Sequence, residues 1–152
     1  MKLRYRKMTP SDLPAVFSVR LSTIENAITM KELEDDYGIT LDSLAKAMSS
    51  HVSGRLCEDS EIVVGFSMGD RLDGEVQVVA VLPEYEGNGI GKSLLAKVQN
   101  WLFSEGHEEI WLGSNPDPTI RAYGFYRKLG WQATGRMKGY DEIMVLRPNK
   151  EG

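Results

Sequence analysis

Residues 75–95 read EVQVVAVLPEYEGNGIGKSLL, in which an apolar run passes through a glycine-rich turn into a different apolar pattern. The first part, from Glu75 to Leu82, is rich in valine and is typical of a strand. After the turn, apolar residues recur at helical spacing at Ile90, Leu94, Leu95, Val98, Trp101 and Leu102. Gly106 is a natural end for this helix. The stretch therefore predicts a strand, a loop and a long helix in direct succession.

The loop between strand and helix contains three glycines, Gly87, Gly89 and Gly91. Residues without a Cβ let successive backbone N–H groups point into one concavity, and the helix N-terminus behind them attracts an anion. A purely structural strand-to-helix turn is the alternative, but such a turn rarely needs three glycines in five residues. The loop is therefore a candidate phosphate-binding site.

Two nucleotide-binding motifs compete for this loop, and both fit it poorly. The dinucleotide fingerprint G-x-G-x-x-G fails in either register, because Lys92 or Leu94 stands where its last glycine belongs. The Walker A motif shares the ending Gly91-Lys92-Ser93, but its first glycine would fall at Glu86. A carboxylate at that position would face the triphosphate. The sequence therefore disfavours a nucleotide triphosphatase.

Strand and helix patterns alternate along the rest of the chain. Strands are predicted over residues 3–8, 52–57, 61–68, 75–82, 109–112, 131–137 and 143–146. Helices are predicted over residues 12–21 and 41–48, from the loop glycines to Gly106, and from Asp117-Pro118 to Leu129. Residues 22–50 form a polar, acidic and partly helical excursion. This order fits an α+β sheet covered by helices better than an all-parallel sheet.

Length and composition suit one soluble globular domain, residues 1–152, with one core: 41% of the residues are hydrophobic and 26% are charged. No segment is apolar and long enough to cross a bilayer, so no membrane partner is predicted. The basic start, Met1 to Lys7, is not followed by the apolar region of a secretory signal. A cytoplasmic location is therefore expected.

Cysteine, histidine and net charge exclude further classes. Cys57 is the only cysteine, which excludes an internal disulfide. The histidines, His51 and His107, are far apart in the sequence and lack other ligand types at metal spacing, so no metal site is predicted. The net charge of −4 argues against nucleic acid as the main partner.

Two stretches of the chain resemble signatures of the GNAT superfamily of acetyl-CoA-dependent N-acetyltransferases. That family's loop is written Gln or Arg, two residues, Gly, one residue, then Gly or Ala, and Glu86, Gly89 and Gly91 stand at the matching positions. The second stretch, TIRAYGFYRKLGW over residues 119–131, matches at Ala122, Tyr126, Gly130 and Trp131. The opening MTPSDLPAV is similar to the family's first strand-to-helix junction. The likeness is weakest from residue 22 to residue 50.

The resemblance implies a GNAT-like α+β fold, with a mixed, mostly antiparallel central sheet of about six to seven strands flanked by helices on both faces. It also implies acetyl-CoA as co-substrate. The residues that it implies for binding acetyl-CoA are Val79, Ala80, Val81, Glu86, Gly87, Asn88, Gly89, Ile90, Gly91, Lys92, Thr119 and Tyr126.

This sequence departs from the family's pattern at two of those positions. Glu86 replaces the usual Gln or Arg. Its side chain is expected to point to solvent at a modest cost in affinity, because backbone N–H groups bind the phosphates. Thr119 stands where the family often has an asparagine that helps to bind the pantetheine arm. That contact is therefore left open.

The implied chemistry needs a neutral amine, yet an alkylamine with a pKa near 10.4 is almost fully protonated at pH 7. A base or desolvation removes this cost of roughly 4 to 5 kcal/mol. Glu75 matches the position of the base in some members of the family, with an ordinary turn carboxylate after Asp73-Gly74 as the alternative. A backbone N–H between Val79 and Val81 is the candidate oxyanion donor. Tyr126 is the candidate that hydrogen-bonds the leaving sulfur and donates its proton, with a packed helix aromatic as the alternative.

The implied reaction is direct transfer from acetyl-CoA to a primary amine of a small molecule or peptide in a ternary complex. A non-catalytic acetyl-CoA-binding or sensing module is the alternative function. The acidic run from Glu25 to Asp36 is the only hint on the acceptor, since carboxylates near an entrance attract a cationic amine. The sequence leaves the identity of the acceptor and the oligomeric state, including a homodimer, open.

Overall fold

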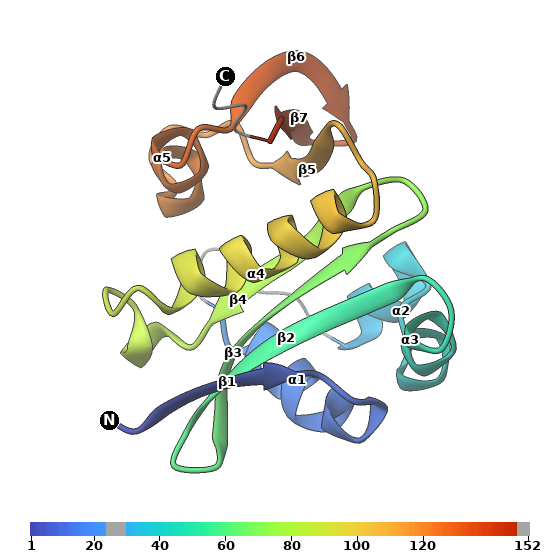
Figure 1. Ribbon diagram of the computed structural model, residues 1–152, viewed down its shortest axis with the longest axis vertical. Helices are drawn as coiled ribbons and strands as arrows, with labels where there is room; N and C mark the ends of the chain where they lie inside the picture. The colour runs from blue at the N-terminus through green and yellow to red at the C-terminus, as the bar shows by residue number, and fades with distance from the viewer. Residues whose placement is uncertain (24–29, 149–152) are drawn as a thin grey trace.

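In the computed structural model, which describes residues 1–23 and 30–148, a seven-stranded sheet runs through the molecule in the order β1-β2-β3-β4-β5-β7-β6 (Figure 1). The strands are β1 (Leu3–Lys7), β2 (Val52–Asp59), β3 (Ile62–Asp70), β4 (Glu75–Val81), β5 (Ile110–Ser114), β6 (Gln132–Lys138) and β7 (Asp141–Leu146). Neighbouring strands are antiparallel except β4 and β5, which are parallel. The predicted mixed, mostly antiparallel sheet is confirmed.

Helices cover both faces of this sheet (Figure 1). They are α1 (Leu13–Leu21), α2 (Met30–Tyr37), α3 (Leu41–Met48), α4 (Ile90–Ser104) and α5 (Arg121–Lys128), with 3-10 turns η1 (Pro10–Asp12) and η2 (Pro83–Tyr85). Behind the sheet in Figure 1, α1 buries its apolar residues against β2 and β3, while α4 lies in front. No helix within the described ranges is long and apolar enough to cross a membrane.

The helix predicted directly after the glycines is α4, and its apolar face is buried as the spacing requires. Ile90, Leu94, Leu95, Val98 and Leu102 are each at most 2% exposed. Burial of a whole Leu or Ile side chain contributes about 1.5–3 kcal/mol, so this face holds the helix against the sheet. The buried Ser67 hydroxyl of β3 also donates a hydrogen bond to the Leu94 carbonyl oxygen at 2.9 Å. The start of α4 is thereby fixed relative to the centre of the sheet.

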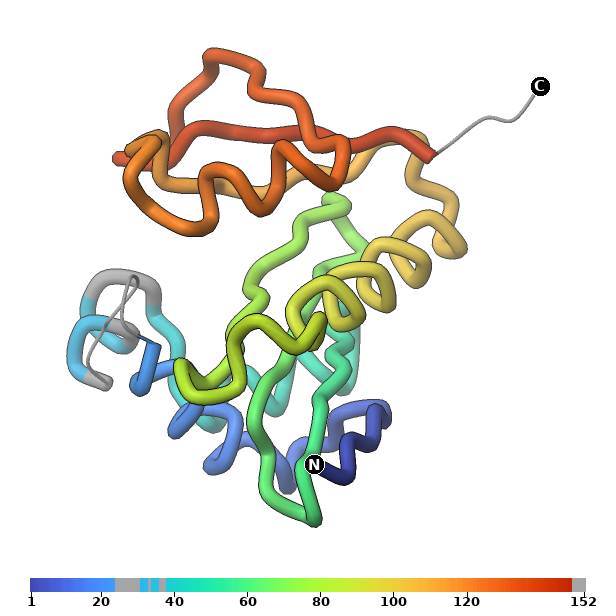
Figure 2. Tube along the Cα trace, turned by 90° about the vertical axis from the view of Figure 1, so that its left-hand side faces the viewer, coloured from blue at the N-terminus to red at the C-terminus, as the bar shows by residue number. Residues whose placement is uncertain are grey.

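The sheet opens between its two parallel strands. Only one register pair, Glu75 with Trp111, joins β4 to β5. The backbone N–H of Trp111 also donates a hydrogen bond to the Gly74 carbonyl oxygen at 3.1 Å, which places the pairing at the very start of β4. Figure 2 shows the C-terminal part, β5 to β7 with α5, diverging from β4 and α4 beyond this point. The later residues of β4 therefore pair with β3 on one side and face an opening on the side of β5.

Several predicted strand ends differ from the structure by one or two residues, and the start of one helix differs by more. The pattern Asp117-Pro118 predicts the start of a helix, but α5 begins at Arg121. The Asp117 carboxylate instead accepts hydrogen bonds from the backbone N–H and the hydroxyl of Thr119, at 2.9 and 2.8 Å. Asp side chains readily form such turns, and here the turn delays the helix. In the acidic excursion, α2 occupies Met30–Tyr37, and residues 24–29 lie outside the described part of the chain.

Candidate active site

A cavity of about 190 Å³ occupies the opening between the two halves of the sheet. The last residues of β4 form one wall, the glycine loop and the first turn of α4 form the floor, and α5 forms the opposite wall. The lining residues are Thr23, Val79, Ala80, Val81, Tyr85, Glu86, Gly87, Gly89, Ile90, Gly91, Lys92, Arg121, Ala122, Phe125 and Tyr126. The two stretches that carry the sequence signatures thus meet across one cavity.

The glycine loop adopts a backbone that requires glycine at two positions. Gly87 has φ +83° and Gly89 has φ +75°, and Gly89 is the N-cap of α4. A Cβ built on either residue would meet no atom within 4 Å, so both positions open onto free space. The Asn88 side chain donates to the Tyr85 carbonyl oxygen at 2.9 Å and ties the loop to η2. The loop is therefore a fixed concavity with room for a ligand at the N-terminus of α4.

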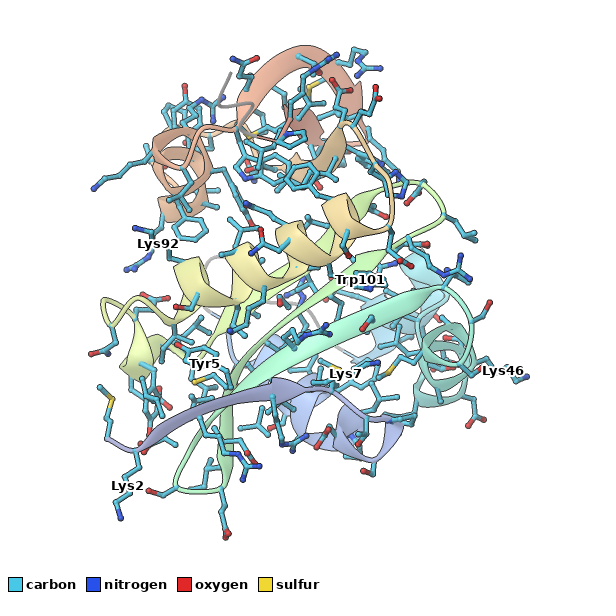
Figure 3. The ribbon with its side chains drawn as sticks, in the orientation of Figure 1. Lys2, Tyr5, Lys7, Lys46, Lys92 and Trp101 are labelled. Atoms are coloured by element: carbon cyan, nitrogen blue, oxygen red, sulfur yellow. The ribbon has the colours of Figure 1, made fainter. Side chains whose placement is uncertain are left out.

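Charged side chains of both signs line the same end of the cavity. Lys92 lies at the start of α4, beneath α5 in Figure 3. Arg121, the first residue of α5, donates from Nη1 to Glu86 Oε2 at 3.0 Å. Glu86 is exposed, as expected, but its carboxylate is also held in an ion pair that the sequence did not predict. Its carboxylate reaches across the cavity and joins the loop to α5.

Tyr126 lines the other part of the cavity. Its ring makes edge contacts with Phe125 and Trp131, with centroid distances of 5.1 and 6.1 Å. Burial raises the pKa of the Tyr126 phenol to about 12, so the hydroxyl stays protonated at neutral pH. Within residues 1–23 and 30–148, the structure gives this hydroxyl no hydrogen-bond partner. A protonated donor is thus available to a group bound in the cavity.

Glu75 lies at the point where β4 and β5 meet, outside the set of lining residues. Val79 lies four positions further along the strand, a distance of about 13 Å. Burial, followed by the nearby Asp73 and Asp70 carboxylates, raises the pKa of Glu75, and Lys138 opposes the shift. Both the raised pKa and the partial burial suit a base, but contact with a ligand in the cavity would need intervening water.

Two other predicted binding residues also lie outside the cavity lining. Asn88 turns its side chain back to the carbonyl oxygens of Tyr85 and Glu86. Thr119 donates its hydroxyl to Asp117. The remaining ten predicted residues, from Val79 to Lys92 and including Tyr126, all line the cavity. Across the described ranges, no group of three or more His, Cys, Asp and Glu side chains is arranged to hold a metal ion.

Sequence reasoning missed several lining residues, of which Thr23, Tyr85 and Arg121 carry polar groups. The Tyr85 hydroxyl donates to Asp59 at 2.6 Å and so holds η2 against the hairpin of β2 and β3. Arg121 directly precedes Ala122 of the second signature, so a basic residue at the start of α5 was visible in the sequence. Its pairing with a loop 35 positions earlier was not.

This chain belongs to the acetyltransferase (GNAT) family, whose model matches residues 19–131. The fold agrees with that membership. The PaiA N-acetyltransferase of Thermoplasma acidophilum, solved in complex with coenzyme A, superposes with a TM-score of 0.81. The superposition covers 97% of this chain and 100% of that one at 20% sequence identity, a level at which the likeness establishes the fold alone.

Curated relatives match over shorter stretches. An uncharacterized N-acetyltransferase of Mycobacterium tuberculosis (strain ATCC 25618 / H37Rv) is 36% identical over 76 residues, which cover 48% of each chain. The glucosamine 6-phosphate N-acetyltransferase of Trypanosoma brucei brucei is 28% identical over 100 residues, 64% of this chain and 65% of that protein. The chain thus spans between about half and two thirds of the length of the curated relatives it matches.

Proposed function

We propose that residues 1–152 act as a single acetyl-CoA-dependent N-acetyltransferase domain, which moves the acetyl group to a primary amine of a small molecule or peptide. One observation carries the proposal: a single cavity joins a glycine loop at a helix N-terminus to a protonated phenol that has no hydrogen-bond partner in the described part of the chain. Family membership supports the same reaction. The buried free thiol of Cys57 is compatible with the reducing cytoplasm in which we propose that the protein works.

The residues of the cavity fit the chemical parts of acetyl-CoA. Phosphates suit the backbone N–H groups of the loop, where a Cβ at Gly87 or Gly89 would fill the open concavity. Lys92 adds a positive charge at the same place. The pantetheine amides suit the edge of β4 from Val79 to Val81, because β5 does not pair with those residues.

Three groups of this chain would act on the reaction. Glu75, through water, accepts the first proton of the substrate ammonium group, and the neutral amine then attacks the thioester carbon; the raised pKa of Glu75 brings it closer to neutral pH. A backbone N–H of β4 between Val79 and Val81 stabilises negative charge on the thioester oxygen. As the new C–N bond forms and the C–S bond breaks, Tyr126 donates a hydrogen bond to the departing thiolate. The nitrogen then loses its second proton to solvent, which also protonates the released thiolate.

For the acceptor, the amine class is as far as the proposal goes. The Trypanosoma brucei brucei relative is named for acetylation of glucosamine 6-phosphate, which supports an amine acceptor for this chain without fixing which amine. A screen of acetyl-CoA consumption against polyamines, amino sugars, amino acids and peptide amines, read as release of free thiol, identifies the class.

Calorimetry with acetyl-CoA and with ATP·Mg²⁺ tests the cofactor directly. We expect acetyl-CoA to bind and ATP·Mg²⁺ to bind much more weakly, because the loop lacks the first glycine of Walker A. Tighter binding of ATP·Mg²⁺ would overturn the proposal. Binding of acetyl-CoA with no thiol release on any amine of the panel would replace the enzyme by a non-catalytic acetyl-CoA-binding module.

A further inference from the structure

The ion pair between Glu86 and Arg121 lies at the phosphate-binding end of the cavity. Both residues line the cavity, and the distance from Arg121 Nη1 to Glu86 Oε2 is 3.0 Å. Glu86 immediately precedes Gly87, the first glycine of the loop. A phosphate held by the loop would therefore lie beside a carboxylate that already occupies the guanidinium.

The backbone of Glu86 is held independently of this pair. Its N–H donates to the Pro83 carbonyl oxygen at 3.2 Å, and its own carbonyl oxygen accepts from the Asn88 side chain at 3.4 Å. The side chains of the pair remain half exposed, 38% for Glu86 and 55% for Arg121. Exposed ion pairs are weak, so this one can exchange partners without disturbing the loop.

The chemistry of the two possible partners favours such an exchange. A guanidinium binds phosphate through two parallel N–H···O bonds, and a phosphate group carries more charge than one carboxylate. Removing Arg121 from Glu86 would leave the carboxylate facing solvent, where it is well hydrated. An incoming phosphate would thus replace the Glu86 carboxylate as the partner of Arg121, and the freed carboxylate would repel the phosphate.

We propose that Arg121 is a phosphate-binding residue of this cavity and that Glu86 competes with the phosphates of the cofactor for it. Glu86 thereby weakens cofactor binding and makes it depend on opening the bridge between the loop and α5. This inference rests on the proposed function, since it assumes that the phosphates of CoA occupy the loop.

Charge-neutral variants test the competition by calorimetry with CoA. Glu86→Gln keeps the length of the side chain and should bind CoA about three- to tenfold more tightly, because both the competing pair and the repulsion are removed. Arg121→Gln should weaken binding, and by a larger factor in the Glu86→Gln background than in the wild type, because Glu86 no longer neutralises the arginine. The advantage of Glu86→Gln should shrink between about 0.05 and 0.5 M NaCl, since salt screens exposed charges.

A matched control is the exposed pair between Arg147 and Glu109, at 3.1 Å, whose residues do not line the cavity. Glu109→Gln removes a similar surface ion pair and should leave the affinity for CoA unchanged. An equal gain in Glu109→Gln and Glu86→Gln would assign the effect to net charge and overturn the competition.

The two proposals fail in different ways. If wild-type protein binds CoA and Glu86→Gln binds it equally or more weakly, the competition is overturned while the proposed function stands. The competition is also overturned if the effects of the Glu86 and Arg121 substitutions are additive. If neither wild type nor Glu86→Gln binds CoA, the proposed function is overturned and the competition with it.

Discussion

Replacing Tyr126 by phenylalanine removes one hydroxyl from the wall of the cavity and leaves the ring. The ring contacts with Phe125 and Trp131 are kept, and the described residues offer the hydroxyl no hydrogen bond that the substitution would break. We therefore expect the free energy of unfolding to change by less than about 0.5 kcal/mol. Any large effect must then come from the reaction.

The size of that effect follows from the pKa of the phenol. Burial raises the pKa of Tyr126 to about 12, whereas an ordinary thiol has a pKa of about 8.5. Full proton transfer to the departing thiolate would thus be uphill by roughly 5 kcal/mol at 1.36 kcal/mol per pKa unit. We therefore expect the phenol to keep its proton and to donate a hydrogen bond to the charged sulfur, which contributes about 1.5–3 kcal/mol. With this raised pKa, we expect hydrogen-bond donation by Tyr126 instead of full proton donation.

Loss of this bond should lower kcat roughly 10- to 100-fold, because the charge on sulfur develops only in the transition state. The assay is release of free thiol with the acceptor found by the amine screen, with affinity for acetyl-CoA measured separately by calorimetry. Affinity should change much less than kcat. The loss should also stay constant from about pH 6 to pH 9, since a phenol with a raised pKa does not ionise in that range. A wild-type kcat in a folded Tyr126→Phe protein would remove the residue from the mechanism.

Two further predictions concern the loop and the N-terminal strand. Gly89→Asp places a side chain in the open concavity, at a residue with φ +75°. The variant should keep the fold, at a cost of about 1 kcal/mol in the free energy of unfolding, and should lose CoA binding because its carboxylate repels the phosphates. Undiminished affinity for CoA by calorimetry would contradict the loop assignment. Hydrogen bonds from Arg6, at 2.7 and 2.8 Å, hold the pKa of Asp12 well below its usual range. A carboxyl with a depressed folded-state pKa stabilises the protein above its unfolded pKa of about 3.9 and loses that contribution as pH falls further. Asp12→Asn should therefore lower the free energy of unfolding by about 1–3 kcal/mol at pH 7 and by progressively less below about pH 4, as measured by urea denaturation. An equal loss at pH 7 and below pH 4 would refute the stabilising role of the ionised Asp12 carboxylate.

Local features of the sequence determined the elements of this protein and pointed to ten of the fifteen residues that line the cavity. The strand-loop-helix of residues 75–95 was predictable because apolar periodicity and glycine conformation are properties of short segments. The burial of Ile90, Leu94 and Leu102 and the positive φ of Gly87 and Gly89 follow from that pattern. The start of α5 was mispredicted because the Asp117 side chain had two local options, a helix cap or a turn with Thr119.

Tertiary structure alone decided which of these elements face each other. The single pairing of Glu75 with Trp111, after which β4 and β5 diverge, creates the cavity and leaves Glu75 outside its lining. Across this cavity, Arg121 Nη1 lies 3.0 Å from Glu86 Oε2. Such contacts depend on how strands and helices that are far apart in the chain pack together. Neither the periodicity of apolar residues nor the spacing of motifs gives the distance between two such elements in space. The sequence thus identified the loop and the tyrosine, while the fold decided which charges share the cavity with them.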